Sequence, residues 1–99
     1  MTEEKLEEGN FLLYIYTPFC GTCTVARGML DKIEAVHGRD IFFEMNASLQ
    51  PDFMKKYKIE SVPCLLIMED QEVKEKIYAF RSTGNIYSYL MKYKTDLFK

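Results

Sequence analysis

The chain has 99 residues, of which 47% are hydrophobic and 28% charged, with a formal net charge of −2. This length suits a single domain over residues 1–99, because domains typically hold about 50 to 200 residues. The slightly acidic balance argues against nucleic-acid binding, which needs a basic excess. The longest apolar stretches are far shorter than the roughly 20 residues of a membrane span. The polar, acidic amino-terminal segment does not resemble a signal peptide, so the expected location is the cytoplasm.

Hydrophobic periodicity and turn residues predict alternating helices and strands along the chain. The expected elements are a helix over 2–8, a strand over 11–17, a helix over 21–37, a strand over 40–46, a helix over 51–58, strands over 63–69 and 73–80, and a helix over 83–97.

The order of these elements predicts an α/β fold. Strands separated by helices favour parallel pairing through right-handed crossovers, and the last two strands, joined by a short turn, should be antiparallel. A mixed four-stranded sheet flanked by helices follows. In the helix over 21–37, we expect one apolar stripe to face the core. Its members are Val25, Met29, Ile33 and Val36.

Three cysteines, an odd number, fit poorly with a framework of structural disulfides. Cys20 and Cys23 are separated by two residues, and Cys64 lies far downstream. In a reducing compartment, such a pair is more often catalytic or metal-binding than architectural. Zinc requires four ligands, and His37 lies at the far end of the helix that Cys23 begins. We therefore expect no metal site, although a merely structural pair of small buried residues stays open.

The cysteine pair lies where a buried strand is followed by a helix. Unpaired amides and the helix dipole favour negative charge at a helix N-terminus. The pKa of Cys20 should therefore lie below the ordinary cysteine value of about 8.5, which makes Cys20 the candidate nucleophile. Cys23, one turn further on, can donate a hydrogen bond to the Cys20 thiolate. It can also attack a mixed disulfide formed on Cys20.

Two segments resemble the motifs of thioredoxin-like thiol–disulfide proteins. They are residues 14–23, YIYTPFCGTC, and residues 57–66, YKIESVPCLL. The resemblance covers nearly the whole chain from Phe11 onward and is greatest to the small thioredoxin-like proteins of Gram-positive bacteria. It implies a thioredoxin fold, and because the segment before Phe11 is abbreviated, we expect the family's first strand to be missing.

The resemblance also implies how substrate is bound. The proline matching Pro63 is cis in that family and faces the cysteine pair, and the main chain of Val62 would pair with an extended substrate segment. Thr17, Pro18 and Phe19 would form an apolar rim. The alternative is a trans Pro63 that only begins an edge strand.

The sequence departs from the family pattern around the cysteines. Phe19 replaces a tryptophan, and Thr22 replaces a proline, which leaves the direction of electron flow open. Tyr14 stands in place of a buried aspartate, and Glu44 stands where a lysine is usual. We expect Glu44 to act as the proton acceptor for Cys23 with the Tyr14 hydroxyl as its partner. The alternative is that Glu44 points to solvent from a strand edge.

Cys64 directly follows Pro63, where a threonine is common. It is either a small buried residue or a thiol that modulates Cys20. The predicted function is a monomeric thiol–disulfide oxidoreductase that reduces protein disulfides through Cys20 and Cys23. It would need no bound cofactor, and an upstream disulfide reductase would restore the dithiol. The alternatives are a redox-sensing or adaptor module with little turnover, and a metal or iron–sulfur carrier using Cys20, Cys23 and Cys64.

Overall fold

The computed structural model describes residues 11–93. Three predictions concern residues outside this range: the helix over 2–8, the expected absence of the family's first strand, and the end of the last helix. Eight elements follow one another in the described part. They are β1 (Phe11–Tyr16), α2 (Gly21–His37), β2 (Phe43–Asn46), the 3-10 helix η1 (Ala47–Leu49), α3 (Pro51–Lys56), β3 (Cys64–Glu69), β4 (Glu72–Ile77) and α4 (Thr83–Tyr93).

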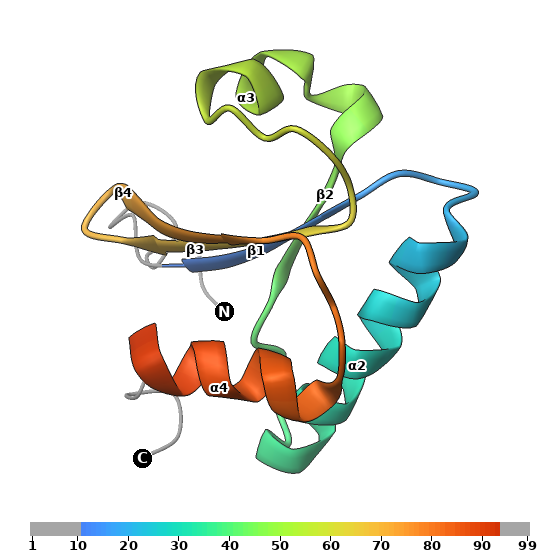
Figure 1. The fold of residues 1–99 in the computed structure, drawn as a ribbon, viewed down its shortest axis with the longest axis vertical. Coiled ribbons are helices and arrows are strands. Elements are labelled where there is room, and N and C mark those ends of the chain that lie inside the picture. The colour runs from blue at the N-terminus through green and yellow to red at the C-terminus, as the bar shows by residue number, and fades with distance from the viewer. Residues whose placement is uncertain (1–10, 94–99) are drawn as a thin grey trace.

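The four strands form one mixed sheet in the order β2-β1-β3-β4. The β1–β2 pair is parallel, and the β1–β3 and β3–β4 pairs are antiparallel. Helix α3 lies on one face of the sheet, and α2 and α4 lie on the other (Figure 1). The predicted α/β fold with a mixed four-stranded sheet is therefore confirmed. None of the helices among residues 11–93 is long and apolar enough to cross a membrane.

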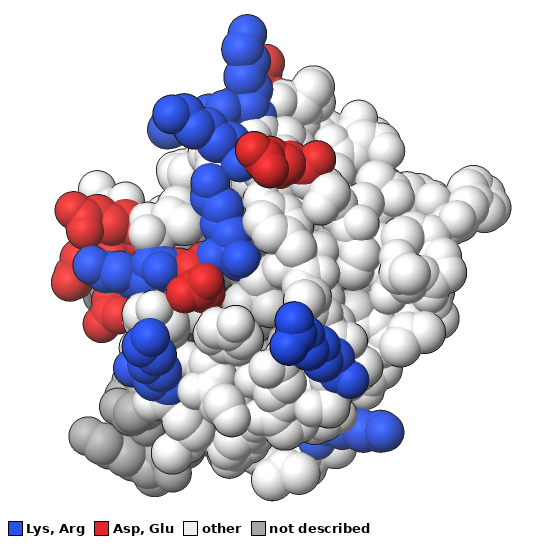
Figure 2. Space-filling view, viewed as in Figure 1, with Lys and Arg blue, Asp and Glu red and all other residues white. Residues whose placement is uncertain are grey.

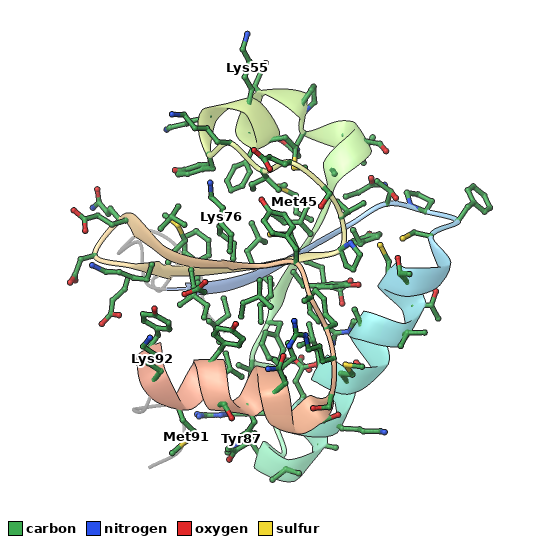
Figure 3. The ribbon with its side chains drawn as sticks, in the orientation of Figure 1. Met45, Lys55, Lys76, Tyr87, Met91 and Lys92 are labelled. Atoms are coloured by element: carbon green, nitrogen blue, oxygen red, sulfur yellow. The ribbon has the colours of Figure 1, made fainter. Side chains whose placement is uncertain are left out.

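Alternating residues of the strands fill two cores, one on each face of the sheet. Leu12 and Tyr14 of β1 belong to the core under α2 and α4, which we call the α2–α4 core. Leu13 and Ile15 belong to the core under α3, the α3 core. Figure 3 shows Met45 and Lys76 on the α3 side of the sheet, while Met91 on α4 points away from it.

Helix α2 has the predicted bounds but buries a different face. Val25 and Val36 are 61% and 76% exposed, so the predicted stripe is wrong at these two positions, whereas Ile33 is buried as predicted. The buried apolar positions are Cys23, Ala26, Leu30 and Ile33. These follow the same three- and four-residue steps, beginning at Cys23, whose inward position at the first turn sets the rotation of the helix. Gly38 ends α2 in the left-handed region, with φ 64°.

Strand β2 begins three residues later than predicted. The amides of Ile41 and Phe42 do not join the sheet there, because both donate to Oε2 of Glu34, at 2.7 and 3.2 Å. Glu34 is buried and also accepts a hydrogen bond from Arg27. A carboxylate on α2 thus satisfies the backbone at the entry to β2.

The other boundaries differ from the predictions by a few residues. Helix α3 ends at Lys56, and Lys58 lies in the left-handed region, with φ 54°. Strand β3 begins after Pro63, which has no N–H to donate. The β3–β4 turn places Asp70 and Gln71 at φ 54° and 65°. Two successive positive φ angles are typical of the type I′ hairpin turn.

Candidate active site

Cys20 is the N-cap of α2, with an extended backbone. Its sulfur accepts a hydrogen bond from the Cys23 amide at 3.2 Å and lies 3.3 Å from the hydroxyl oxygen of Thr22. Hydrogen bonding by the Cys23 thiol, and then by Thr22, lowers the pKa of the Cys20 thiol below its ordinary value. Cys20 is partly exposed. A partly exposed sulfur with a lowered pKa can act as a nucleophile.

Cys23 lies one turn further into α2 and is buried. Burial, and then the hydrogen bond between its thiol and Cys20, raises the pKa of Cys23. The two thiols are not linked to each other in this structure. Their environments differ as a nucleophile and a resolving thiol require: Cys20 ionises first, and Cys23 holds its proton and donates to Cys20.

The Tyr14 hydroxyl is bound to Cys23 and not to Glu44. It donates to the Cys23 carbonyl oxygen at 2.5 Å. A hydrogen bond from the Thr17 backbone and, to a smaller extent, the Tyr14 hydroxyl act to lower the pKa of Cys23. Burial raises the pKa of Tyr14 well above its ordinary value, so the hydroxyl stays a donor at neutral pH. Tyr14 therefore lies where it can stabilise negative charge on Cys23.

Glu44 lies on β2, directly opposite Tyr14 in the parallel register. Its side chain is 47% exposed, and Oε1 is 3.2 Å from Nη1 of Arg27. The predicted Tyr14–Glu44 pair is wrong, because the Tyr14 hydroxyl reaches the nearer Cys23 while Glu44 turns outward at the edge strand. The alternative of a solvent-facing Glu44 is the one that the structure has.

Arg27 is the residue of this region that the sequence interpretation missed. One turn after Cys23, it binds three carboxylates: Asp31 at 2.8 Å through Nε, the buried Glu34 through Nη2, and Glu44 through Nη1. The Nη1–Glu44 contact is an ion pair by distance, without an aligned hydrogen bond to any described residue. The i,i+4 spacing of Arg27 and Asp31 was the available signal, but it gave no hint of Glu34 or Glu44.

The β1–α2 loop presents Phe19 next to Cys20. Phe19 is fully exposed and has a φ of 61°, in the left-handed region. This conformation costs a non-glycine residue about 1–2 kcal/mol. Pro18 is exposed and Thr17 half-buried beside it. Figure 2 shows few charged side chains over this loop and the first turns of α2, whereas acidic side chains gather at the β3–β4 hairpin.

The Val62–Pro63 peptide bond is cis, as the resemblance implied. Pro63 is buried and Val62 half-buried. Pro63 shares a hollow of about 350 Å³ with Thr22 and Val25 of α2, which places it next to the cysteine loop. Tyr78 and Phe80 also line this hollow, and the sequence interpretation did not include them.

Cys64 does not join the other two cysteines. It belongs to the α3 core, on the other side of the sheet from Tyr14, because side chains alternate along β3. Burial raises its pKa to about 12. No group of three possible metal-binding side chains is found among residues 11–93. The predicted roles of Cys64, as a modulating thiol or as the third ligand of a three-cysteine site, therefore lack the proximity that they need.

Comparison with known proteins gives a consistent result. The family model described as thioredoxin matches residues 2–92. The thioredoxin-like protein YusE of Bacillus subtilis is 40% identical over 93 residues, covering 94% of this chain and 87% of that protein. A thioredoxin of Staphylococcus aureus is 24% identical over 92 residues, with 92% and 88% covered. A mutant thioredoxin from Halobacterium salinarum superposes with a TM-score of 0.74 at 15% identity, with 88% and 76% covered.

Proposed function

This chain belongs to the thioredoxin family, and from that premise we propose that it is a thiol–disulfide oxidoreductase that reduces protein disulfides. The observation that carries the proposal is the unequal pair of thiols at the start of α2. Hydrogen bonding lowers the pKa of the partly exposed Cys20, whereas burial raises the pKa of Cys23. Such a reductant suits the cytoplasm, where other thiol systems keep disulfides reduced.

The proposed reaction moves two electrons from the protein to the substrate. The Cys20 thiolate attacks one sulfur of the substrate disulfide, the substrate S–S bond breaks, and the other substrate sulfur leaves as a thiolate. Cys23 loses its proton and attacks Cys20, which frees the second substrate sulfur and closes a Cys20–Cys23 disulfide. The two substrate thiolates take up two protons, one that Cys23 gives up and one that Cys20 released to solvent when it ionised. An upstream disulfide reductase returns two electrons and two protons, so no bound cofactor is needed.

Tyr14 is the proposed helper of the second step. Its hydroxyl donates toward Cys23 and favours the Cys23 thiolate. Glu44, whose carboxylate lies near Arg27 and not near the Tyr14 hydroxyl, is left without a direct path to the Cys23 proton. Cys23 and Glu44 both line a hollow of about 790 Å³ beside the cysteine pair. A proton that passes from Cys23 to Glu44 would therefore have to travel through water in this hollow.

The proposed substrate-binding groups surround Cys20. The main chain of Val62, next to cis-Pro63, would pair with an extended substrate segment. Thr17, Pro18 and the exposed ring of Phe19 would form the apolar rim. The protein partners are therefore disulfide-containing proteins that can offer an extended strand to this rim.

Insulin reduction with dithiothreitol as electron donor tests the proposal. The natural protein should accelerate precipitation of the insulin B chain, and Cys20→Ser should abolish the acceleration. Cys23→Ser should accumulate a mixed disulfide with insulin that is visible by mass spectrometry under non-reducing conditions. A reversible Cys20–Cys23 disulfide without turnover would instead indicate a redox-sensing module. If Cys20 proved unreactive at neutral pH, both functions would be excluded.

A further inference from the structure

The loop over residues 57–63 connects α3 to β3 and ends with the Val62–Pro63 peptide. We call it the α3–β3 loop. The amides of Tyr57 and Ile59 donate to carbonyl oxygens of α3 at 3.1 and 2.9 Å. Further along, Glu60 is exposed and Val62 is half-buried. Helix α3 therefore holds the first half of the loop, on the side away from the proposed substrate-binding main chain.

Two side chains from the end of β4 bind the backbone of the same loop. Tyr78 directly follows β4, and its hydroxyl oxygen accepts a hydrogen bond from the Glu60 amide at 3.2 Å. Lys76 donates from Nζ to the carbonyl oxygen of Lys58, also at 3.2 Å. The two residues are separated by one position along an extended chain, so they share a face of the sheet. Figure 3 shows Lys76 on the α3 side, where the ring of Tyr78 packs on the α3 core.

The backbone at these contacts needs support from outside the loop. Lys58 has a φ of 54°, in the left-handed region. This conformation is unfavourable for a residue other than glycine and persists only where the surroundings fix it. The bond from Lys76 fixes the carbonyl group of that same residue. Tyr78 also lines the hollow that Pro63 shares with Thr22, so it lies between the loop and the cysteine motif.

We propose that Tyr78 and Lys76 position the main chain of Val62 for pairing with an extended substrate segment. They do so by binding the loop backbone at Glu60 and Lys58. This inference rests on the proposed function and deepens it. A main chain that is already ordered loses less conformational entropy when a strand pairs with it, so the substrate binds more tightly. Both residues act through the loop and take no part in the exchange of bonds between sulfurs.

The inference predicts that only substrates with a peptide main chain depend on Tyr78. Insulin has such a chain, whereas hydroxyethyl disulfide contains no peptide bond. In insulin reduction with dithiothreitol, Tyr78→Phe should raise KM by about fivefold and keep kcat within about twofold, because it weakens binding and leaves the chemistry unchanged. The rate constant for oxidation of the reduced protein by hydroxyethyl disulfide should stay within about twofold. Rapid alkylation followed by mass spectrometry measures that rate constant.

Two further variants assign the effect to the loop. Lys76→Met removes the second contact and keeps most of the side chain, so it should also raise KM for insulin, and the double variant with Tyr78→Phe should raise it at least about tenfold. Tyr93→Phe is the matched control. The Tyr93 hydroxyl donates to Oε2 of Glu75 on β4 at 3.0 Å, on the α2–α4 side of the sheet. Removal of the same atom there should leave KM unchanged.

Amide hydrogen exchange reports on the loop itself. The amides of Glu60 and Val62 should exchange faster in Tyr78→Phe than in the natural protein, and those of α2 should keep their rates. An unchanged KM, an unchanged exchange rate at Glu60, or an equal rise of KM in Tyr93→Phe would overturn the inference. Equal slowing with insulin and hydroxyethyl disulfide would place the effect on the dithiol and would also overturn it.

The natural protein separates this inference from the proposed function. If it reduces insulin and only the variants behave unexpectedly, the inference fails and the proposed function stands. If hydroxyethyl disulfide oxidises its dithiol but insulin is not reduced, the proposed protein substrates are wrong, and the inference fails with them. If neither disulfide reacts, the redox function itself is overturned.

Discussion

Cys23 and Cys64 are both buried thiols close to the central strand β1, on opposite faces of the sheet. Cys64 has the apolar side chains of the α3 core around it, and burial raises its pKa to about 12. Burial, and then the hydrogen bond with Cys20, also raise the pKa of Cys23, but hydrogen bonds from the Thr17 backbone and, to a smaller extent, from Tyr14 partly oppose that rise. Burial alone therefore produces an unreactive thiol, and neighbouring polar groups make the same residue type usable.

The largest expected effect separates Cys20 from Cys64. Cys20→Ser should lower the rate of insulin reduction by at least about a thousandfold, since it removes the nucleophile. Cys64→Ala should keep that rate within about twofold. Because the pKa of Cys20 is lowered, alkylation of Cys20 by iodoacetamide should rise at lower pH than for an ordinary cysteine. Cys64 should stay unmodified until the protein unfolds. Mass spectrometry of the alkylated protein across pH measures both, and early labelling of Cys64 would contradict the contrast.

The next effect concerns stability on the α2 side of the sheet. Glu34→Gln should lower the free energy of unfolding by about 2–3 kcal/mol, because the buried carboxylate binds Arg27 and the amides of Ile41 and Phe42. Asp31→Asn is the control, since that exposed partner of Arg27 should contribute less than about 1 kcal/mol. Urea unfolding measures both. If both variants lost the same free energy of unfolding, burial of the Arg27–Glu34 pair would make no extra contribution to stability.

Tyr14→Phe tests one of the polar groups that distinguish Cys23 from Cys64. Without the hydroxyl, the pKa of Cys23 should rise further, so at neutral pH a smaller fraction is thiolate. The mixed disulfide should therefore last about tenfold longer, whereas alkylation of Cys20 should keep its rate. Rapid quenching followed by mass spectrometry measures the lifetime. If the variant slowed the attack of Cys20 but released the mixed disulfide at the normal rate, Tyr14 would act on Cys20 and the prediction would be wrong.

The smallest effect comes from the β3–β4 turn, which lies apart from both thiols in the chain. Gln71→Gly should stabilise the protein by about 0.5–1 kcal/mol, because Gln71 has a φ of 65° that glycine adopts without strain. Insulin reduction should be unchanged. Thermal unfolding measures the change in stability. A gain in stability with unchanged activity would show that the difference in reactivity between Cys23 and Cys64 does not depend on overall stability.

Local patterns were enough to predict the elements that contain the cysteines. The apolar strand, the cysteine at the start of a helix and Gly38 at its end are local features, and the structure places α2 at the predicted residues. The rotation of α2 was not predictable, because Val25 and Leu30 are equally apolar and only packing selects Leu30 for the core. The Tyr14–Cys23 hydrogen bond joins residues nine apart on different elements.

The charged groups were the hardest to place. Arg27, Glu34 and Glu44 come together because α2 and β2 are neighbours in space, which depends on the final packing and not on their spacing in the chain. Charged residues are usually exposed, so Glu34 gave no sign of being buried. A long-range network of this kind becomes visible only when the tertiary structure is known.

The backbone of Phe19 has one more consequence. A ring held out into water directly before Cys20 meets an approaching molecule before the sulfur does. A flat protein surface is therefore kept at a distance, whereas a surface with a recess for the ring can approach. Burying the ring stabilises the complex by roughly 1.5–3 kcal/mol. Phe19 therefore favours partner proteins with a complementary recess before disulfide exchange begins.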